Sequence, residues 1–191
     1  MEPKIRIGGI EILSPREIVY DILRYKTTGT VLDLGAGFGR HSLFLASHGF
    51  IVTAVEKETE KLEKLKQQAG DLPADITTVC ADVIDFASDM KFDVVIATMV
   101  LHFLPEQQAK AMIKKMKEYT TTGGLNVITV YTDANPGNLR LYQFKKQELR
   151  ALYHGWNILQ YEESLGGLID NPKDCGPSQR CVARMIARKL N

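Results

Sequence analysis

Hydrophobic residues fall into two recurring patterns along most of this chain: short continuous runs and longer stretches with helical spacing. The short runs predict strands, which we place at Val31–Leu34, Ile51–Glu56, Ile76–Cys80 and Asp93–Thr98. Thr122–Tyr131 is predicted as a fifth strand or as a hairpin leading into one. The longer stretches predict helices at Arg40–His48, Thr59–Ala69 and Glu106–Tyr119. Because strands and helices alternate, we expect βαβ units and a mainly parallel sheet.

The segment before this alternation carries a weaker pattern. Residues 1–13 indicate no clear element. Ser14, Pro15 and Glu17 then predict a helix start, with Ser14 as the cap and Glu17 closing a capping box. We expect this helix to end near Tyr25.

The segment after the alternation predicts fewer elements and more loop. We expect a loop over 132–144, a short helix over Lys146–Tyr153, and strands over Trp156–Glu163 and Cys181–Lys189. The stretch 165–180 between those strands contains several glycines and prolines, which indicates a long connection.

Composition mainly excludes classes of protein. The 191 residues are 45% hydrophobic and 25% charged with a net charge of +1, which fits one globular domain and gives no electrostatic reason to expect a nucleic-acid or membrane partner. No apolar run approaches the roughly 20 residues of a membrane span. The three cysteines form no Cys-x-x-Cys pair, so we expect no zinc or other metal site and a reducing, cytoplasmic location.

The segment Asp33-Leu34-Gly35-Ala36-Gly37-Phe38-Gly39-Arg40 joins a predicted strand to a predicted helix. Glycines at such a junction allow a tight turn and a close approach of the backbone to a ligand. The helix start offers N–H groups to a negative group. Arg40 can pair with a carboxylate of the ligand or with a neighbouring acid.

Two acidic residues follow the next two strands. Glu56 ends the second strand, about twenty residues after the loop, where an acid can accept hydrogen bonds from both hydroxyls of a ribose. Asp82, after the third strand, can accept from an adenine amino group, and the backbone of Val83 can contact the ring edge. The set predicts a nucleotide-type ligand.

The loop departs from two common nucleotide motifs. A dinucleotide fingerprint requires Gly-x-Gly-x-x-Gly or Ala, whereas Arg40 stands in the third place here and Gly39 comes one position early. A P-loop requires Gly-Lys-Ser/Thr, which the sequence lacks.

The run from Val31 to Arg40 resembles motif I of the class I S-adenosylmethionine (SAM)-dependent methyltransferases. Glu56, Asp82-Val83 and the strand Phe92–Thr98 fall where that family has its ribose-binding acid, adenine contact and fourth strand. The resemblance covers residues 30–131 and implies SAM as the cofactor. We expect it to be bound by Asp33, Gly35, Ala36, Gly37, Arg40, Glu56, Lys57, Asp82, Val83 and Thr98, the last bordering the methionine part through its backbone carbonyl.

The resemblance implies a single α/β domain that is Rossmann-like. We expect a mostly parallel seven-stranded sheet with an antiparallel C-terminal strand and helices on both faces. Residues 1–29 would form an N-terminal segment and helix, 30–131 the cofactor-binding half, and 132–191 the substrate-side loop and C-terminal strands.

A narrower resemblance extends toward the C-terminus. The stretches Phe144–Trp156, Tyr161–Glu163 and Met185–Lys189 look like the tellurite-resistance methyltransferases of the TehB type. That subfamily has a His-Arg pair before its last strand, assigned to the active site, whereas Ile169-Asp170 stands at the matching place here. The N-terminal segment also differs from the subfamily.

Candidates for acceptor chemistry lie after the fourth and fifth strands. His102 can act as a base or shape the acceptor pocket, or it can pack beside the cofactor with no proton role. Arg140 can hold an anionic acceptor, or it can be a solvated loop residue. Tyr131 and Tyr142 can line the pocket or belong to the core. A base is needed only if the acceptor holds a proton.

The predicted function is methyl transfer from SAM to a small-molecule or oxyanion acceptor, of which tellurite and selenite are examples. Thr98-Met99-Val100-Leu101 stands where amino-directed nucleic-acid methyltransferases carry Asn/Asp-Pro-Pro-Tyr/Phe, which disfavours a nucleic-acid substrate. Two alternatives remain open: a non-catalytic SAM-binding sensor or partner subunit, and a nucleotide-cofactor oxidoreductase. The sequence also leaves a homodimer open.

Overall fold

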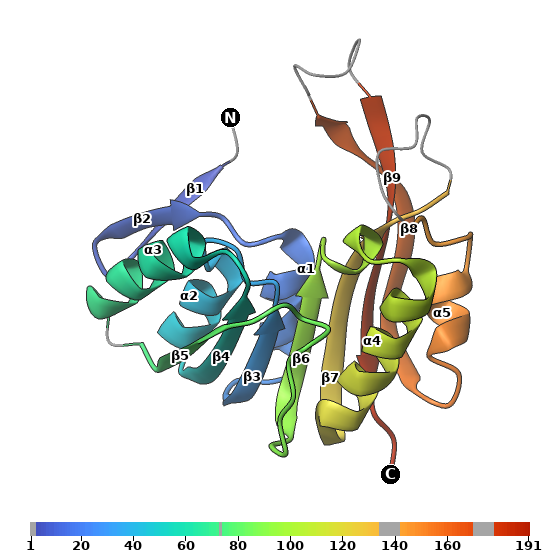
Figure 1. Cartoon of the computed structure of the whole chain (residues 1–191), viewed down its shortest axis with the longest axis horizontal. Coiled ribbons are helices and arrows are strands. Elements are labelled where there is room, and N and C mark those ends of the chain that lie inside the picture. The colour runs from blue at the N-terminus through green and yellow to red at the C-terminus, as the bar shows by residue number, and fades with distance from the viewer. Residues whose placement is uncertain (1–2, 73, 134–141, 170–177) are drawn as a thin grey trace.

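The computed structural model describes residues 3–72, 74–133, 142–169 and 178–191 (Figure 1). Its strands are β1 Lys4–Ile7, β2 Ile10–Leu13, β3 Gly29–Leu34, β4 Phe50–Glu56, β5 Ile76–Cys80, β6 Phe92–Thr98, β7 Thr120–Tyr131, β8 Asn157–Ile169 and β9 Ser178–Arg188. Its α-helices are α1 Glu17–Tyr20, α2 Arg40–Ser47, α3 Thr59–Gly70, α4 Glu106–Tyr119 and α5 Glu148–Leu152. Two 3₁₀ turns, η1 Asp21–Arg24 and η2 Leu101–Phe103, complete the described elements.

Seven of the strands form one sheet in the order β5-β4-β3-β6-β7-β9-β8. The pairs β5–β4, β4–β3, β3–β6 and β6–β7 are parallel, as βαβ units require. β9 pairs antiparallel with both β7 and β8 and lies between them. The predicted mostly parallel seven-stranded sheet with one antiparallel strand is therefore confirmed.

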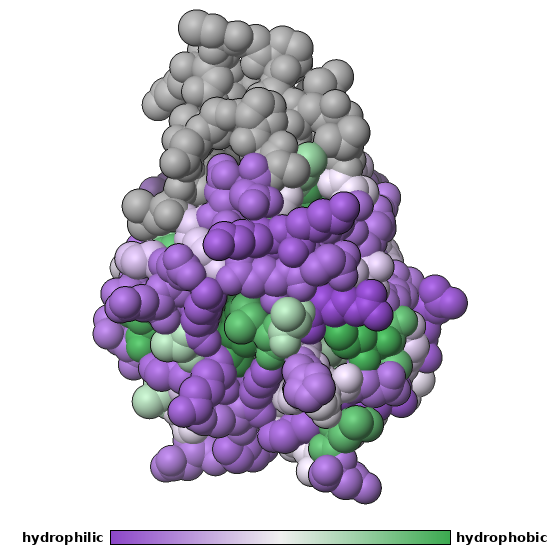
Figure 2. Space-filling view, turned by 90° about the vertical axis from the view of Figure 1, so that its right-hand side faces the viewer, coloured by the Kyte–Doolittle hydropathy of each residue, from purple (hydrophilic) through white to green (hydrophobic). Residues whose placement is uncertain are grey.

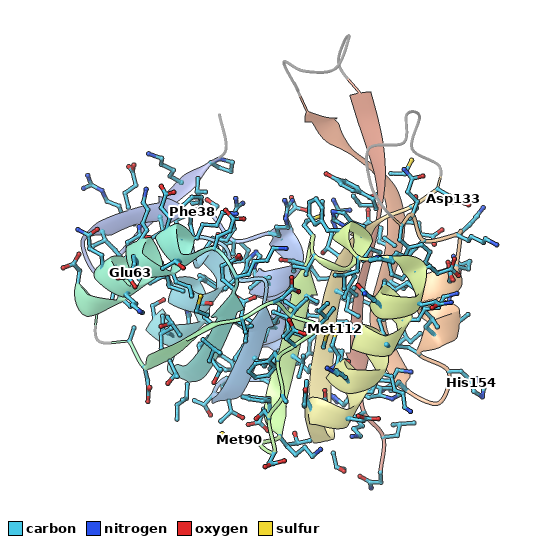
Figure 3. All side chains as sticks on the ribbon, viewed as in Figure 1. Phe38, Glu63, Met90, Met112, Asp133 and His154 are labelled. Atoms are coloured by element: carbon cyan, nitrogen blue, oxygen red, sulfur yellow. The ribbon has the colours of Figure 1, made fainter. Side chains whose placement is uncertain are left out.

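Helices cover both faces of this sheet because β6 and its neighbours are apolar on both sides. Val94 and Ile96 face one core with α1 and α2, and α3 extends this layer over β4. Val95 and Ala97 face a second core with α4 and α5. Figure 3 shows Met112 between α4 and the sheet, where it is buried.

The outer side of the molecule next to α4 and α5 is largely hydrophilic. Figure 2 shows this side, on which hydrophobic side chains form small separate areas. No described helix is both long enough and apolar enough to cross a membrane.

The N-terminal segment forms a hairpin, and its helix starts later than predicted. Within residues 1–13, where the sequence indicates no clear element, β1 and β2 pair antiparallel around Gly8 and Gly9, whose φ angles are 55° and 93°. The prediction that Ser14 caps the helix was wrong: its N–H donates to the carbonyl of Pro3 at 2.9 Å, which extends the hairpin. The helix begins later, with Arg16 at the N-cap position and no side-chain cap bond.

The C-terminal strands are longer than predicted. β8 continues to Ile169 and β9 starts at Ser178, so the two ends of the expected long connection, residues 165–169 and 178–180, are strand. Glycine-containing segments were interpreted as loop, but pairing between the two strands extends through Leu168 opposite Gln179. The register shifts between Leu165 and Leu168, which accommodates the glycines as an irregularity within the ladder.

Candidate functional site

The glycine loop after β3 lies at the edge of the sheet where the parallel strands β3 to β6 end. The backbone N–H groups of Gly35 and Ala36 both donate to the carbonyl of Val55 at the end of β4, at 2.8 and 3.0 Å. Gly35 has a φ of +70°, and a Cβ there would lie 2.4 Å from a methyl carbon of Val100. This position therefore requires glycine for both its backbone conformation and its packing.

The carboxylate of Glu56 is fixed by backbone N–H groups from two loops. Oε2 accepts from Gly37 at 2.9 Å, and Oε1 accepts from Lys57 and Glu58 at 2.9 and 3.0 Å. The side chain is only 7% exposed, yet it lines a cavity. Since a carboxylate has about four acceptor positions, Glu56 keeps capacity for a ligand hydroxyl.

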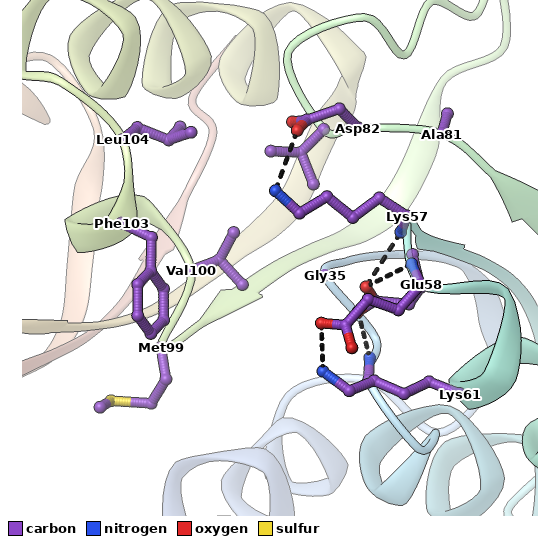
Figure 4. A pocket seen from close by; sticks show the side chains of 13 residues that line it. Gly35, Lys57, Glu58, Lys61, Ala81, Asp82, Met99, Val100, Phe103 and Leu104 are labelled. Atoms are coloured by element: carbon purple, nitrogen blue, oxygen red, sulfur yellow. Dashed lines mark hydrogen bonds and ion pairs between the residues drawn. The ribbon is translucent and has the colours of Figure 1, made fainter.

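The larger of two neighbouring cavities, about 480 Å³, opens beside Glu56. Its lining residues are Gly35, Gly37, Glu56, Lys57, Glu58, Lys61, Ala81, Asp82, Val83, Met99, Val100, Phe103 and Leu104. Figure 4 shows a polar wall of Lys57, Glu58, Lys61 and Asp82 opposite an apolar wall from the segment after β6. A ligand with a flat apolar part and several hydroxyls matches these two walls.

Lys57 and Asp82 bridge the polar wall. The ammonium of Lys57 lies 3.2 Å from Oδ2 of Asp82, and Oδ1 of Asp82 accepts from the N–H of Ile84 at 3.3 Å. Val83 beside them is buried. The carboxylate of Asp82 can still accept a hydrogen bond from a ligand, but the ion pair with Lys57 partly neutralises its charge (Figure 4).

The smaller cavity, about 200 Å³, continues from the larger one. Its lining residues are Leu13, Arg16, Gly35, Ala36, Gly37, Phe38, Arg40, His41, Lys61, Thr98 and Met99, of which Gly35, Gly37, Lys61 and Met99 also line the larger cavity. Three of its residues are cationic side chains, so this end favours an anionic group.

A buried histidine connects two sides of the smaller cavity. The hydroxyl of Thr98 lies 3.1 Å from Nδ1 of His41, and Nε2 of His41 accepts from the backbone N–H of Arg16 at 3.5 Å. Burial, together with the charges of Arg40 and Arg16, lowers the pKa of His41 to about 3. The ring is therefore neutral at physiological pH.

Asp33 lies beneath the glycine loop. It is 1% exposed, and its Oδ2 accepts from the hydroxyl of Ser42 in α2 at 2.7 Å. Burial raises the pKa of Asp33 to about 6, and the nearby charge of Glu56 adds to the increase, while the Ser42 hydrogen bond opposes it. Asp33 lines neither of the two cavities, so its geometry fits support of the loop better than ligand contact.

Nine of the ten predicted cofactor residues line these cavities. The larger cavity includes Gly35, Gly37, Glu56, Lys57, Asp82 and Val83, and the smaller one adds Ala36, Arg40 and Thr98. Residues scattered over four segments of the sequence thus meet at one edge of the sheet. Their contact with a cofactor stays a prediction.

The predicted acceptor residues that the structure describes, His102, Tyr131 and Tyr142, are not among those lining the two cavities. His102 is fully buried, with its ring 4.5 Å from that of Phe103 and 4.4 Å from that of Tyr131. Tyr142 is also buried and donates its N–H to the carbonyl of His102 at 3.3 Å. Arg140 lies outside the described residues, so its role stays a prediction, as does that of His102.

The stretch that matches the subfamily's His-Arg pair is only partly described. Ile169 ends β8, and Asp170 lies outside the described residues. Within the described ranges, no group of three or more His, Cys, Asp or Glu side chains is arranged to hold a metal ion.

Several cavity residues were not predicted from the sequence. Met99 has a φ of +60°, unusual for a residue other than glycine, and lines both cavities. Phe103 and Leu104 complete the apolar wall, whereas Arg16 and His41 border the smaller cavity. The apolar run from Met99 to Leu104 directly after a buried strand was the available signal for the first group. Arg16 and His41 had none beyond their proximity to predicted helix starts.

Known proteins resemble this chain in both sequence and structure. A probable S-adenosyl-L-methionine-dependent methyltransferase TehB of Haemophilus influenzae is 31% identical over 174 residues, which are 90% of this chain and 61% of that protein. The crystal structure of TehB from H. influenzae superposes with a TM-score of 0.82 at 30% identity, over 90% of this chain and 61% of the other. The chain thus spans about three fifths of these relatives' length.

A more distant structure shares the fold alone. Burkholderia thailandensis 1,6-didemethyltoxoflavin-N1-methyltransferase, solved with 1,6-didemethyltoxoflavin and S-adenosylhomocysteine, has a TM-score of 0.72 at 20% identity, over 92% of this chain and 78% of that one.

The family model described as tellurite resistance protein TehB matches residues 13–177. That match covers the site and β8 and ends before β9, and it argues against the oxidoreductase alternative. The chain belongs to the tellurite resistance protein TehB family.

Proposed function

We propose that this protein binds SAM across the two cavities and transfers its methyl group to a small-molecule acceptor. The buried carboxylate of Glu56 carries the proposal, because it faces the larger cavity while three backbone N–H groups hold it in place. An acid fixed at the end of the second parallel strand suits a ribose, whose two hydroxyls can share the acceptor capacity that the three N–H groups leave. The H. influenzae relative's name, a probable SAM-dependent methyltransferase, supports the same cofactor.

The described residues fit the parts of this cofactor. Gly37 has no heavy atom within 4 Å of where a Cβ would lie, so the loop leaves room for a ligand beside its backbone. The apolar wall of Val100, Phe103 and Leu104 suits an adenine ring. Arg16 and Arg40 in the smaller cavity suit the methionine carboxylate.

When bound, SAM supplies a methyl group on a positively charged sulfur. The chain's own contribution is to position that end and to exclude water. Thr98 is the last residue of β6, and Met99 follows it where the two cavities meet. These two residues therefore border the position between the nucleoside and amino-acid parts of the cofactor. A general base is required only for an acceptor that carries a proton at the working pH.

The acceptor we propose is a small molecule or an oxyanion, with tellurite and selenite as the first candidates. The family description supports this class. The net charge of +1 gives no broad basic surface for nucleic acid. Cytoplasmic location and a homodimer remain predictions that accompany this proposal.

Two measurements test the proposal. Calorimetry with S-adenosylhomocysteine and with NADH should show binding of the first and none of the second; the reverse would refute the proposed cofactor. Incubation with methyl-labelled SAM and an acceptor panel that includes tellurite and selenite should then give a labelled product. Binding without any labelled product across the panel would contradict the proposed methyltransferase activity and favour a SAM-binding sensor.

A further inference from the structure

We infer that His41 is a positioning residue that turns the hydroxyl of Thr98 toward the smaller cavity, where its proton is donated to the carboxylate of the bound cofactor's methionine part. This inference rests on the proposed function for the identity of the ligand. Its geometric part rests on contacts among three segments that are far apart in the sequence: the start of α1, the start of α2 and the end of β6.

The contact with Arg16 determines which ring nitrogen of His41 carries the proton. A backbone N–H can only donate, and that of Arg16 points at Nε2 of His41 at 3.5 Å. Nε2 must therefore be the acceptor nitrogen of the neutral ring. The proton then resides on Nδ1, which donates to the Thr98 hydroxyl oxygen at 3.1 Å.

The hydroxyl of Thr98 thus accepts from His41 and must direct its own proton elsewhere. The neighbouring hydroxyl belongs to Thr129, which pairs with Thr98 in the β6–β7 register. Thr129 Oγ1 is buried and has no hydrogen-bond partner among the described residues, so it does not take this proton. Thr98 lines the smaller cavity, which leaves a ligand atom there as the acceptor.

The residues around His41 and Thr98 keep the histidine ring in one protonation state and favour an anionic group of the ligand. The low pKa of His41, about 3, keeps the ring neutral, so it carries a single proton across the physiological range. Arg16 and Arg40 line the same cavity and favour an anion. In the methionine part of SAM the anionic hydrogen-bond acceptor is the carboxylate, which matches both the hydroxyl donor and the cationic surroundings.

The binding test compares S-adenosylhomocysteine with methylthioadenosine, which lacks the amino-acid part. Thr98→Val removes the hydroxyl at nearly constant shape, and Thr98→Ser is the control that keeps it. We expect Thr98→Val to weaken S-adenosylhomocysteine binding by roughly tenfold, the loss typical of a hydrogen bond to a charged group, with methylthioadenosine binding unchanged. Thr98→Ser should bind both ligands like the wild type.

The same pair of ligands tests His41. His41→Leu should weaken S-adenosylhomocysteine binding about as much as Thr98→Val, and the double variant should bind no more weakly than either single variant, because both changes remove one interaction. His41→Asn, whose amide can donate in place of Nδ1, should retain more affinity than His41→Leu. Thermal unfolding identifies variants that fail to fold, and His41→Asn keeps the test decisive if His41→Leu is one of them.

A measurement without ligand tests the geometry alone. The ¹⁵N shifts of the His41 ring should report a proton on Nδ1, and a proton on Nε2 would overturn the inference. Equal weakening of both ligands, or none, in Thr98→Val would also overturn it. If the wild type binds neither ligand, the proposed function fails and the carboxylate assignment fails with it, while the NMR result still decides the orientation of the hydroxyl.

Discussion

Two carboxylates, one at the base of the glycine loop and one at its rim, differ in their hydrogen-bond donors and in whether they face a cavity. At the base, Asp33 is buried and accepts from one side chain, Ser42. At the rim, Glu56 faces a cavity and accepts from three backbone N–H groups. The two acids belong to neighbouring strands: Asp33 is the penultimate residue of β3 and Glu56 is the last residue of β4. The base supports the loop, and the rim presents its hydrogen-bonding groups to the cavity.

This difference implies that substitutions at the base should mainly change the free energy of unfolding, whereas substitutions at the rim should mainly change ligand affinity. The four predictions below test that separation, beginning with the largest expected effect.

The largest effect should come from Gly35 at the base. Gly35→Ala brings a Cβ to 2.4 Å from Val100 at a φ of +70°, so strain and overpacking together should lower the free energy of unfolding by about 2–4 kcal/mol. The matched rim variant is Gly37→Ala, at a φ of +59° with nothing within 4 Å. It should cost only about 1–2 kcal/mol but should impair S-adenosylhomocysteine binding. Equal unfolding costs in urea titrations would contradict the separation.

Asp33→Asn should stabilise the protein at pH 8 by up to about 3 kcal/mol, since burial raises the pKa of Asp33 from 3.8 to about 6. A carboxyl with a raised pKa binds its proton more tightly in the folded state. The wild type therefore loses stability as the pH rises from about 4 to about 6, and the asparagine does not. Urea unfolding from pH 4 to pH 8 measures the difference, which should vanish at the acidic end.

His41 provides an internal check on that profile. Its pKa is lowered from 6.5 to about 3, so its contribution to stability is lost as the pH falls below about 6.5. In the wild type this loss offsets the gain from Asp33 over the same pH range. Asp33→Asn should therefore show a steeper decline toward acid than the wild type, and parallel profiles would exclude the raised pKa of Asp33.

At the rim, Glu56→Ala should weaken S-adenosylhomocysteine binding by about 1–3 kcal/mol, because the ribose hydroxyls lose a buried acceptor. Glu56→Gln keeps the size of the side chain and one acceptor oxygen, so it should lie between the alanine variant and the wild type. Calorimetry gives the affinities. Unchanged affinity in both variants would mean that the ribose lies elsewhere.

The smallest effect should come from the Lys57–Asp82 ion pair, because its side chains are 66% and 30% exposed. Lys57→Met should change the free energy of unfolding by less than about 1 kcal/mol. Asp82→Asn serves as the partner control and should have a similarly small effect on unfolding. A larger change in urea titrations for either variant would show that this part of the rim also supports the fold.

The sequence predicted the parts of the fold whose pattern is local. β3, β4, β5 and β6 are short apolar runs, and their order along the chain determined a parallel sheet with the glycine loop at one edge. The hairpin of β1 and β2 was missed because each strand has four residues, too few for alternation to stand out. β8 was predicted too short because Gly166 and Gly167 indicated a turn, whereas pairing with β9 overrides that local preference.

The candidate site likewise contains residues that the sequence could predict and residues that it could not. Gly37, Glu56 and Asp82 could be predicted because ligand-binding groups follow the ends of parallel strands, which the sequence locates. The contacts of His41 with Thr98 and Arg16 could not, since they join segments whose proximity exists only in the folded sheet. His102 follows β6 as the sequence predicts, and the structure buries it beside Tyr131, while its role stays a prediction.

The place of β9 in the sheet has a consequence for biogenesis. β8 joins the sheet only through β9, the later of the two in the chain. During synthesis β8 therefore leaves the ribosome before its pairing partner exists, and the outer edge of β7 stays open for the same interval. Unpaired strand edges are where nascent chains associate wrongly. Correct assembly of the sheet thus depends on how soon after β8 is synthesised β9 can pair between β7 and β8.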